Sequence, residues 1–194
     1  MMHATRGKSI NFSPKINELE DMIRSGSKVL TYSRNNIWSS EIALWQDTVE
    51  KSPEKERPHI NLGFVLNNHG RRDDAIKHYL LALKINPDSD KAHNNLGNIF
   101  NDLGRTDQAI KHYLRAISIK PDLVEAYSNL GNVLLVQGRT EEAIEHYLHA
   151  LRINPYFREG DINLGNLLNK QGRTEEAIEH YCLLYTSPSP RDRG

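Results

Sequence analysis

The chain has 194 residues, of which 38% are hydrophobic and 26% charged, and its 25 basic and 25 acidic residues give a formal net charge of zero. This balance does not favour nucleic acid or an anionic membrane as a partner, because both attract a basic excess. No apolar run approaches the roughly 20 residues of a membrane-spanning helix, and no secretory signal is present. We therefore favour a cytoplasmic location, and no motif identifies the compartment further.

The N-terminal segment, residues 1–36, carries only weak structural signals. A helical pattern is present around Ile16–Tyr32, where it is degenerate, and Ser25–Ser33 is too polar to cross a membrane. We expect this segment to be poorly ordered or to contain one degenerate helix.

A helix is predicted over Ser39–Lys51, within the region 37–55. Trp45 lies 34 positions before Tyr79, and Pro53 keeps the same spacing to the proline that closes the next unit. This region is therefore interpreted as the second helix of a degenerate repeat.

From residue 56 onward, the sequence repeats with a period of 34 residues. The tripeptide Asn-Leu-Gly, a second glycine followed by arginine, the pairs Ala-Ile and His-Tyr, and a closing proline all keep this period. Chance does not hold so many positions in phase, so the chain is a repeat array. The units are 56–89, 90–123, 124–157 and the truncated 158–181.

Each unit contains two amphipathic helical patterns joined by a short connection. In the second unit, Leu96 and Phe100 lie on one face of the first helix. We expect Gly104 to end this helix in the left-handed conformation and Thr106 to cap the next one. A connection this short places the two helices side by side and antiparallel.

Small residues are predicted to let the two helices of a unit approach closely. Gly97 is expected to face Ala109 and Ala116, with Tyr113 filling the remaining space. Replacing Gly97 by leucine should therefore overpack this contact, at a cost on the order of 1–3 kcal/mol.

These motifs resemble the tetratricopeptide repeat (TPR) family in its small and large signature positions and its terminal proline. The resemblance covers residues 56–181 and implies an all-α, right-handed solenoid of antiparallel helix pairs whose first helices line a concave surface. At the position where the family usually has its first aromatic residue, this chain has other residues in most repeats. The aspartate at this position in the fourth repeat suggests a looser last repeat. The residues at that position are His59, His93, Tyr127 and Asp161.

Asparagines recur on the first helices at positions that do not pack inward. A carboxamide carries donors and an acceptor, so such rows could hold an extended peptide backbone without reading its side chains. The pattern resembles the asparagine ladder of O-linked N-acetylglucosamine transferases. Alternatively, the amides cap helices, bridge neighbouring repeats or keep the groove wet. The first amide row is Asn61, Asn95, Asn129 and Asn163, and the second amide row is Asn98, Asn132 and Asn166.

A second binding mode of the family clamps a C-terminal carboxylate with lysine, arginine and asparagine. Lys91, Asn98 and Asn129 match part of that pattern. Asn94 stands where a further lysine is expected, and the partner arginine is missing. We do not favour this clamp, but Lys91 and Asn94 remain candidate groove residues.

No catalytic, phosphate-binding or metal motif is present in the sequence. One histidine recurs per repeat, and such a spacing is too wide for the ligands of a single zinc ion. The leading hypothesis is therefore a non-enzymatic scaffold, without cofactor, that binds an extended peptide or a partner helix. The recurring histidines are His78, His112, His146 and His180.

An alternative hypothesis makes the chain the substrate-recruiting portion of a larger glycosyltransferase. Residues 34–53 (RNNIWSSEIALWQDTVEKSP) resemble the sequence before the TPR region of some polytopic membrane glycosyltransferases. The resemblance of the amide rows to a glycosyltransferase superhelix points to the same class.

The C-terminal stretch 182–194 does not continue the repeat pattern. It begins CLLYTSPSPRD, which resembles the translation of a transposase adapter used in sequencing-library preparation. We expect an artefactual disordered tail, with the natural protein continuing past Tyr181. A genuine Ser/Pro tail is the alternative. The truncated end would leave the last helix uncapped, which favours non-native self-association there.

Overall fold

The computed structural model describes residues 41–186, and the chain divides into two units, Met1–Asp47 and Thr48–Gly194. Residues 41–51 are helical. The expectations for residues 1–36, and the first two residues of the predicted helix Ser39–Lys51, lie outside the described residues.

The second unit is built from consecutive helices of similar length, joined by tight turns. Two helices form each repeat, and residues 41–186 contain no strand. The helices are α3 (Glu56–Asn68), α4 (Arg72–Ile85), α5 (Asp90–Asp102), α6 (Thr106–Ile119), α7 (Val124–Val136), α8 (Thr140–Ile153), α9 (Arg158–Lys170) and α10 (Thr174–Thr186).

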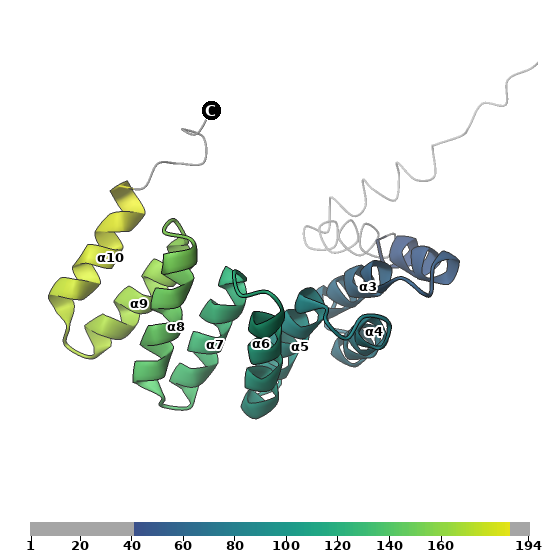
Figure 1. Cartoon of the computed structure of the whole chain (residues 1–194), viewed down its shortest axis with the longest axis horizontal. Helices are drawn as coiled ribbons and strands as arrows, with labels where there is room; N and C mark the ends of the chain where they lie inside the picture. The colour runs from purple at the N-terminus through teal and green to yellow at the C-terminus, as the bar shows by residue number, and fades with distance from the viewer. Residues whose placement is uncertain (1–40, 187–194) are drawn as a thin grey trace, which may run out of the picture. The chain divides into compact units, whose positions relative to one another are not determined.

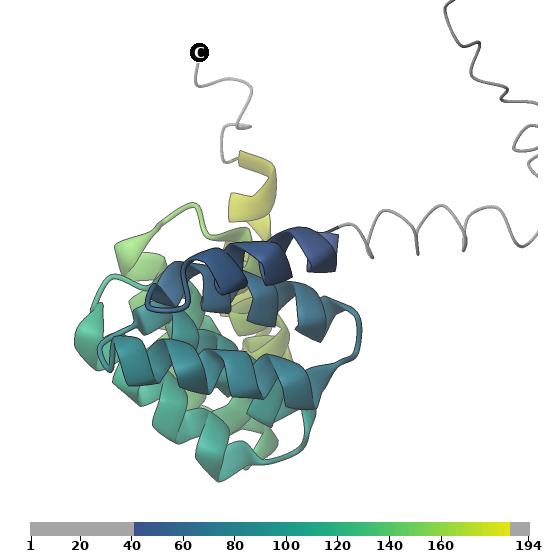
Figure 2. The same ribbon diagram turned by 90° about the vertical axis from the view of Figure 1, so that its right-hand side faces the viewer.

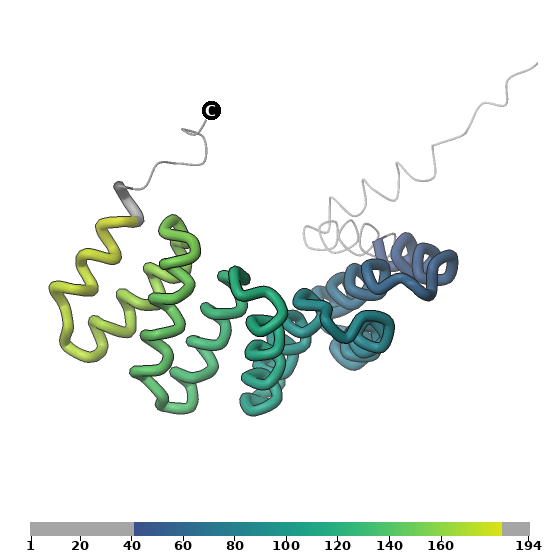
Figure 3. Tube along the Cα trace, viewed as in Figure 1, coloured from purple at the N-terminus to yellow at the C-terminus, as the bar shows by residue number. Residues whose placement is uncertain are grey.

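Within the second unit, the helices stack in chain order (Figure 1). Each first helix packs on the second helix of its own repeat, and α5, α7 and α9 also pack on the second helix of the preceding repeat. Successive first helices contact one another as well. Figure 2 looks along the stack from the end that carries α3 and α4, and Figure 3 shows the turns at which the chain reverses. This arrangement is the predicted all-α, right-handed solenoid of antiparallel helix pairs.

The core of each repeat contains a tyrosine ring packed over a glycine. Tyr113 is 1% exposed, and a Cβ atom built on Gly97 would lie 2.5 Å from its Cε1. The expectation that Gly97 faces Ala109 and Ala116 is therefore wrong in its main partner. Both alanines are buried. The Tyr113 ring, however, occupies the space that a side chain at position 97 would need, so the ring is the reason that glycine stands there.

The turn inside each repeat follows a recurring backbone pattern. Gly104 has φ +69°, so the left-handed conformation predicted at the end of α5 is confirmed. The N–H of Arg105 donates to the carbonyl of Phe100 at 2.8 Å, and that of Gly104 donates to Asn101 at 2.9 Å, which together form a Schellman motif. Thr106 is the first residue of α6, preceded by Arg105, so the predicted threonine cap is wrong. The motif uses Arg105 and lets the next helix begin directly after it.

The last helix continues further than the sequence pattern indicated. Residues 182–186 belong to α10, so the disorder expected from residue 182 is wrong at its start. The physical reason is that residues 182–187 contain no proline or glycine, so nothing interrupts the helix between Tyr181 and Pro188. Residues 187–194 lie outside the described residues. None of the described helices is both long and apolar enough to cross a bilayer.

Candidate functional site

The two amide rows lie on successive first helices of the solenoid. The first amide row is half-buried throughout, and the second is half-buried except for Asn166, which is exposed. Because successive first helices contact one another, residues at the same position in neighbouring repeats lie along one face of the stack. The sequence period therefore becomes a row of amides in space.

A hydrogen-bond network connects the two amide rows across repeat boundaries. Oδ1 of Asn98 accepts from the hydroxyl of Tyr113 at 2.8 Å and from Nδ2 of Asn129 at 3.0 Å. One repeat later, Oδ1 of Asn132 accepts from Tyr147 at 2.6 Å and from Asn163 at 3.3 Å. Part of the asparagine pattern therefore bridges neighbouring repeats.

The same network leaves other polar atoms of the amides unused. No hydrogen bond between described residues engages Nδ2 of Asn98 or Oδ1 of Asn129. A neutral amide has two N–H donors on nitrogen and two acceptor sites on oxygen. Each such boundary therefore combines a fixed amide orientation with a free donor and a free acceptor, the two groups that a peptide backbone requires.

Burial raises the pKa of the tyrosines that orient this network. The pKa of Tyr147 is raised to about 12, mainly by burial and further by the charge of Glu159. Burial also raises the pKa of Tyr113. Both hydroxyls therefore remain protonated at neutral pH and donate to the asparagine oxygens.

The first repeat departs from the network at Phe64, which occupies the position of Asn98 in the next repeat. A phenyl ring offers no acceptor, and the Tyr79 hydroxyl bonds to Asn95 instead. Phe64 is 53% exposed. A cavity of about 250 Å³, here named the Phe64 pocket, is lined by Ile60, Asn61, Phe64, Lys91, Asn94, Asn95 and Leu123.

Two further predicted groove residues, Lys91 and Asn94, meet in the Phe64 pocket. Oδ1 of Asn94 is buried and has no hydrogen-bond partner. Lys91 is exposed, and no described residue forms an ion pair with it. The pocket therefore combines apolar carbon with an open acceptor and an open cation, a combination that the sequence pattern did not reveal.

The recurring histidines have partners that sequence reasoning missed. Nδ1 of His59 lies 3.1 Å from Nδ1 of His78, and the same atoms of His93 and His112 are 3.0 Å apart. The signal was present, since the first aromatic position and the recurring histidine are 19 residues apart in each repeat. Two nitrogens do not complete a zinc site, and no cluster of three or more potential ligands occurs among the described residues.

Burial favours the neutral form of three members of these pairs, His78, His93 and His112, by lowering their pKa values. Burial, together with the smaller effects of the nearby His93 and Lys111 charges, lowers the pKa of His112 to about 4. His59 donates from Nε2 to the Pro53 carbonyl at 3.1 Å, so its Nδ1 accepts from Nδ1–H of His78.

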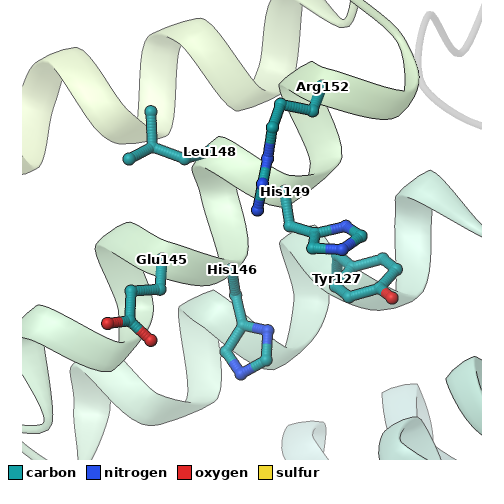
Figure 4. Close-up of a pocket in the computed structure, with 6 residues that line it drawn as sticks. All are labelled: Tyr127, Glu145, His146, Leu148, His149 and Arg152. Carbon is teal, nitrogen blue, oxygen red and sulfur yellow. The ribbon is translucent and has the colours of Figure 1, made fainter.

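A second pocket, of about 580 Å³, lies on α7 and α8 and contains neither amide row. The ring of His149 stacks on that of Tyr127, with centroids 4.2 Å apart and planes 11° from parallel (Figure 4). Glu145 and Arg152 carry opposite charges at its edge, so it does not select a ligand of one sign. The lining residues are Tyr127, Glu145, His146, Leu148, His149 and Arg152.

Family models match most of the repeat region. The model described as TPR repeat matches residues 66–104 and 97–138, and two models described as Tetratricopeptide repeat match residues 124–157 and 162–187. The chain therefore belongs to the tetratricopeptide repeat proteins, a class of protein–protein interaction scaffolds.

Two curated relatives are similar to a short part of this chain. A protein O-mannosyl-transferase of Caenorhabditis elegans is 36% identical over 56 residues, which are 29% of this chain and 8% of that protein. Protein O-mannosyl-transferase TMTC1 of Homo sapiens is 36% identical over 55 residues, which are 28% of this chain and 6% of that protein. The similarity thus spans only a small fraction of either relative.

Solved structures share the fold of the chain. The Pseudomonas aeruginosa protein PilF aligns with a TM-score of 0.72 and 22% identity over 84% of this chain and 75% of its own. MamA from Desulfovibrio magneticus aligns with a TM-score of 0.65 and 18% identity, covering 88% of this chain and 90% of its own. At these identities, the likeness supports the TPR solenoid and carries no functional argument.

Proposed function

We propose that this TPR scaffold binds an extended peptide in the concave groove along its two amide rows. The observation that supports the proposal is the network of Asn98, Tyr113 and Asn129, which recurs one repeat later. In each copy the buried tyrosine hydroxyl and the neighbouring amide fix one asparagine oxygen. Amide groups fixed before binding lose little freedom when a ligand arrives.

The repeat spacing suits an extended chain. Packed helices lie about 8–10 Å apart, and an extended peptide advances about 3.3 Å per residue. Each repeat would therefore meet about three residues of the ligand, and backbone groups would return to an equivalent amide once per repeat. The groove would hold many sequences, because the amides contact backbone atoms.

The test is selection from a random peptide display library on the purified chain, followed by direct binding of the enriched peptides. A variant with Asn95, Asn129 and Asn163 all replaced by alanine should lose the binding of those peptides. It must first be shown to fold, by circular dichroism and a denaturation curve, because two of these amides also bridge repeats.

A matched control changes three exposed residues that share one position of the second helices. This control replaces Lys111, Glu145 and Glu179 by alanine, the same number of substitutions as in the asparagine variant. All three residues lie outside the amide rows, so peptide binding should stay intact. Retained binding by the folded asparagine variant, or no enrichment of any peptide, would reject the proposal.

A second candidate function is substrate recruitment within a larger glycosyltransferase. It rests on the 36% identity to protein O-mannosyl-transferases over 55–56 residues. An independent long read of the source DNA across the codons of Tyr181 and Cys182 tests it. An open reading frame that joins these repeats to a glycosyltransferase domain would support this function, and a gene without such a domain would remove it.

A further inference from the structure

We infer that the Phe64 pocket reads one position of the bound chain and takes a large apolar side chain that has an acidic neighbour. This inference rests on the proposed function and goes beyond it, because amide rows alone do not distinguish side chains. The groove would thus hold most of the peptide through its backbone and set its register at one point.

Phe64 replaces a second-row asparagine and makes this part of the groove apolar. Phe64 stands where Asn98, in the next repeat, accepts from a buried tyrosine. Its ring is 53% exposed, although Ile60 beside it is only 7% exposed. Leu123 lines the same pocket, and these three side chains form an apolar surface that interrupts the polar rows.

The size of the pocket favours one side chain as its occupant. Its volume of about 250 Å³ lies below the roughly 300–1,000 Å³ typical of small-molecule sites. Burying a leucine or phenylalanine side chain against apolar walls is favourable by about 1.5–3 kcal/mol. The unpartnered Oδ1 of Asn94 lines the same pocket and can accept a backbone N–H next to that side chain.

Charge complementarity identifies the neighbour as acidic. One exposed row follows the second residue of each first helix, and its sign changes along the groove. The row borders the groove, because its member Lys91 lines the Phe64 pocket together with Asn61 and Asn95 of the first amide row. Its members are Arg57, Lys91, Glu125 and Glu159.

The change of sign confines an acidic side chain to the first two repeats. Lys91 lines the Phe64 pocket itself, and neither Arg57 nor Lys91 forms an ion pair with a described residue. Glu125 and Glu159 would repel the same acidic group in the later repeats. The occupant is therefore an extended peptide in which an apolar and an acidic residue are adjacent.

The probes are capped Ser/Gly peptides, long enough to cross all four repeats, that differ at two central positions. The four central pairs are Leu-Glu, Leu-Lys, Ser-Glu and Ser-Ser, and each affinity is measured by fluorescence anisotropy. The Leu-Glu peptide should bind at least about tenfold more tightly than the Ser-Glu and Ser-Ser peptides, because one buried leucine accounts for about that factor. It should also bind more tightly than the Leu-Lys peptide, because the lysine of that peptide would face the like charge of Lys91.

Two variants use residues that the chain already places at equivalent positions. Phe64→Asn restores the second-row asparagine and gives Tyr79 the acceptor found in other repeats, so it should fold. It should abolish the preference for leucine over serine. Lys91→Glu introduces the residue found at Glu125, and it should reverse the preference between Leu-Glu and Leu-Lys.

The outcomes separate this inference from the proposed function. Equal binding of all four peptides, or a leucine preference that survives Phe64→Asn, would overturn the inference and leave backbone binding intact. Failure of every peptide to bind would overturn both. A concentration-dependent dimer that Phe64→Asn abolishes, seen by analytical ultracentrifugation, would assign the pocket to a second copy of the chain and also overturn the inference.

Discussion

Asn129 donates from Nδ2 to Oδ1 of Asn98 at 3.0 Å, and this bond joins the second repeat to the third. The same oxygen accepts from the hydroxyl of Tyr113, whose side chain is buried. Asn98→Ala removes the acceptor of both donors, whereas Asn129→Ala removes only one bond.

We predict that Asn98→Ala lowers the free energy of unfolding by about 1–3 kcal/mol and Asn129→Ala by about 1 kcal/mol. The larger loss arises because the Tyr113 hydroxyl stays buried without a partner. Urea denaturation of the three proteins measures the difference. Equal losses would contradict the role assigned to the Asn98 oxygen.

The glycine beneath each tyrosine ring should not tolerate even a methyl group. A Cβ at Gly97 would lie 2.5 Å from the ring of Tyr113, and one at Gly63 would lie 2.9 Å from the ring of Tyr79. Alanine gains about 1 kcal/mol of helix propensity over glycine, while overpacking costs about 1–3 kcal/mol.

We therefore expect Gly97→Ala to be net destabilising, and more so than Gly63→Ala, in thermal or urea denaturation. The tighter contact gives the first variant the larger steric cost for the same gain in propensity. A stabilised Gly97→Ala protein would show that the ring moves aside freely.

Substitutions at the turn glycines test the backbone conformation alone, because an added side chain would not clash with any neighbour. Gly104 has φ +69°, and nothing lies within 4 Å of a Cβ placed there. Gly104→Ala should cost about 1–2 kcal/mol, because an L-residue is strained in the left-handed region. Gly104→Asn should cost less, since asparagine enters that region more readily. Equal stability of both variants and the parent chain, by denaturant midpoint, would argue against the Schellman turn.

Acid should destabilise the repeats that contain histidine pairs. Burial lowers the pKa of His112 from its ordinary value of 6.5 to about 4 in the folded chain. Between these values the unfolded chain binds a proton that the folded chain does not, so stability is fully present above pH 6.5 and falls as the pH drops toward 4.

The matched measurement compares the parent chain with His112→Gln, which removes this titrating group. The slope of the unfolding free energy against pH, measured between about pH 4 and pH 6.5, should be smaller for the variant than for the parent chain. An unchanged slope would mean that His112 titrates as it does in the unfolded chain.

The repeat period predicted the solenoid because every repeat packs only on its neighbours. Sequence reasoning placed Gly104 correctly, since a positive φ depends on local backbone. It missed the pairing of His93 with His112 because that contact depends on how two antiparallel helices align. It misplaced the partner of Gly97 for the same reason, as the direction of the Tyr113 ring is set by tertiary packing.

The amide rows were recognised from sequence, but their internal bonding was not. Spacing alone left peptide binding and bridging of repeats as alternatives. In the structure, an amide such as Asn129 bridges two repeats through Nδ2, and its Oδ1 forms no hydrogen bond with a described residue. The Phe64 pocket escaped prediction because it combines α3, α5 and the residue before α7.

The most direct test of the central claim is an NMR titration that follows the side-chain amide signals of the chain as the Leu-Glu peptide is added. We predict saturable shifts of the Asn98 and Asn132 NH₂ signals, with the His149 and Tyr127 signals of the second pocket, on α7 and α8, unmoved. Saturable binding that leaves both asparagine amides unchanged would contradict it.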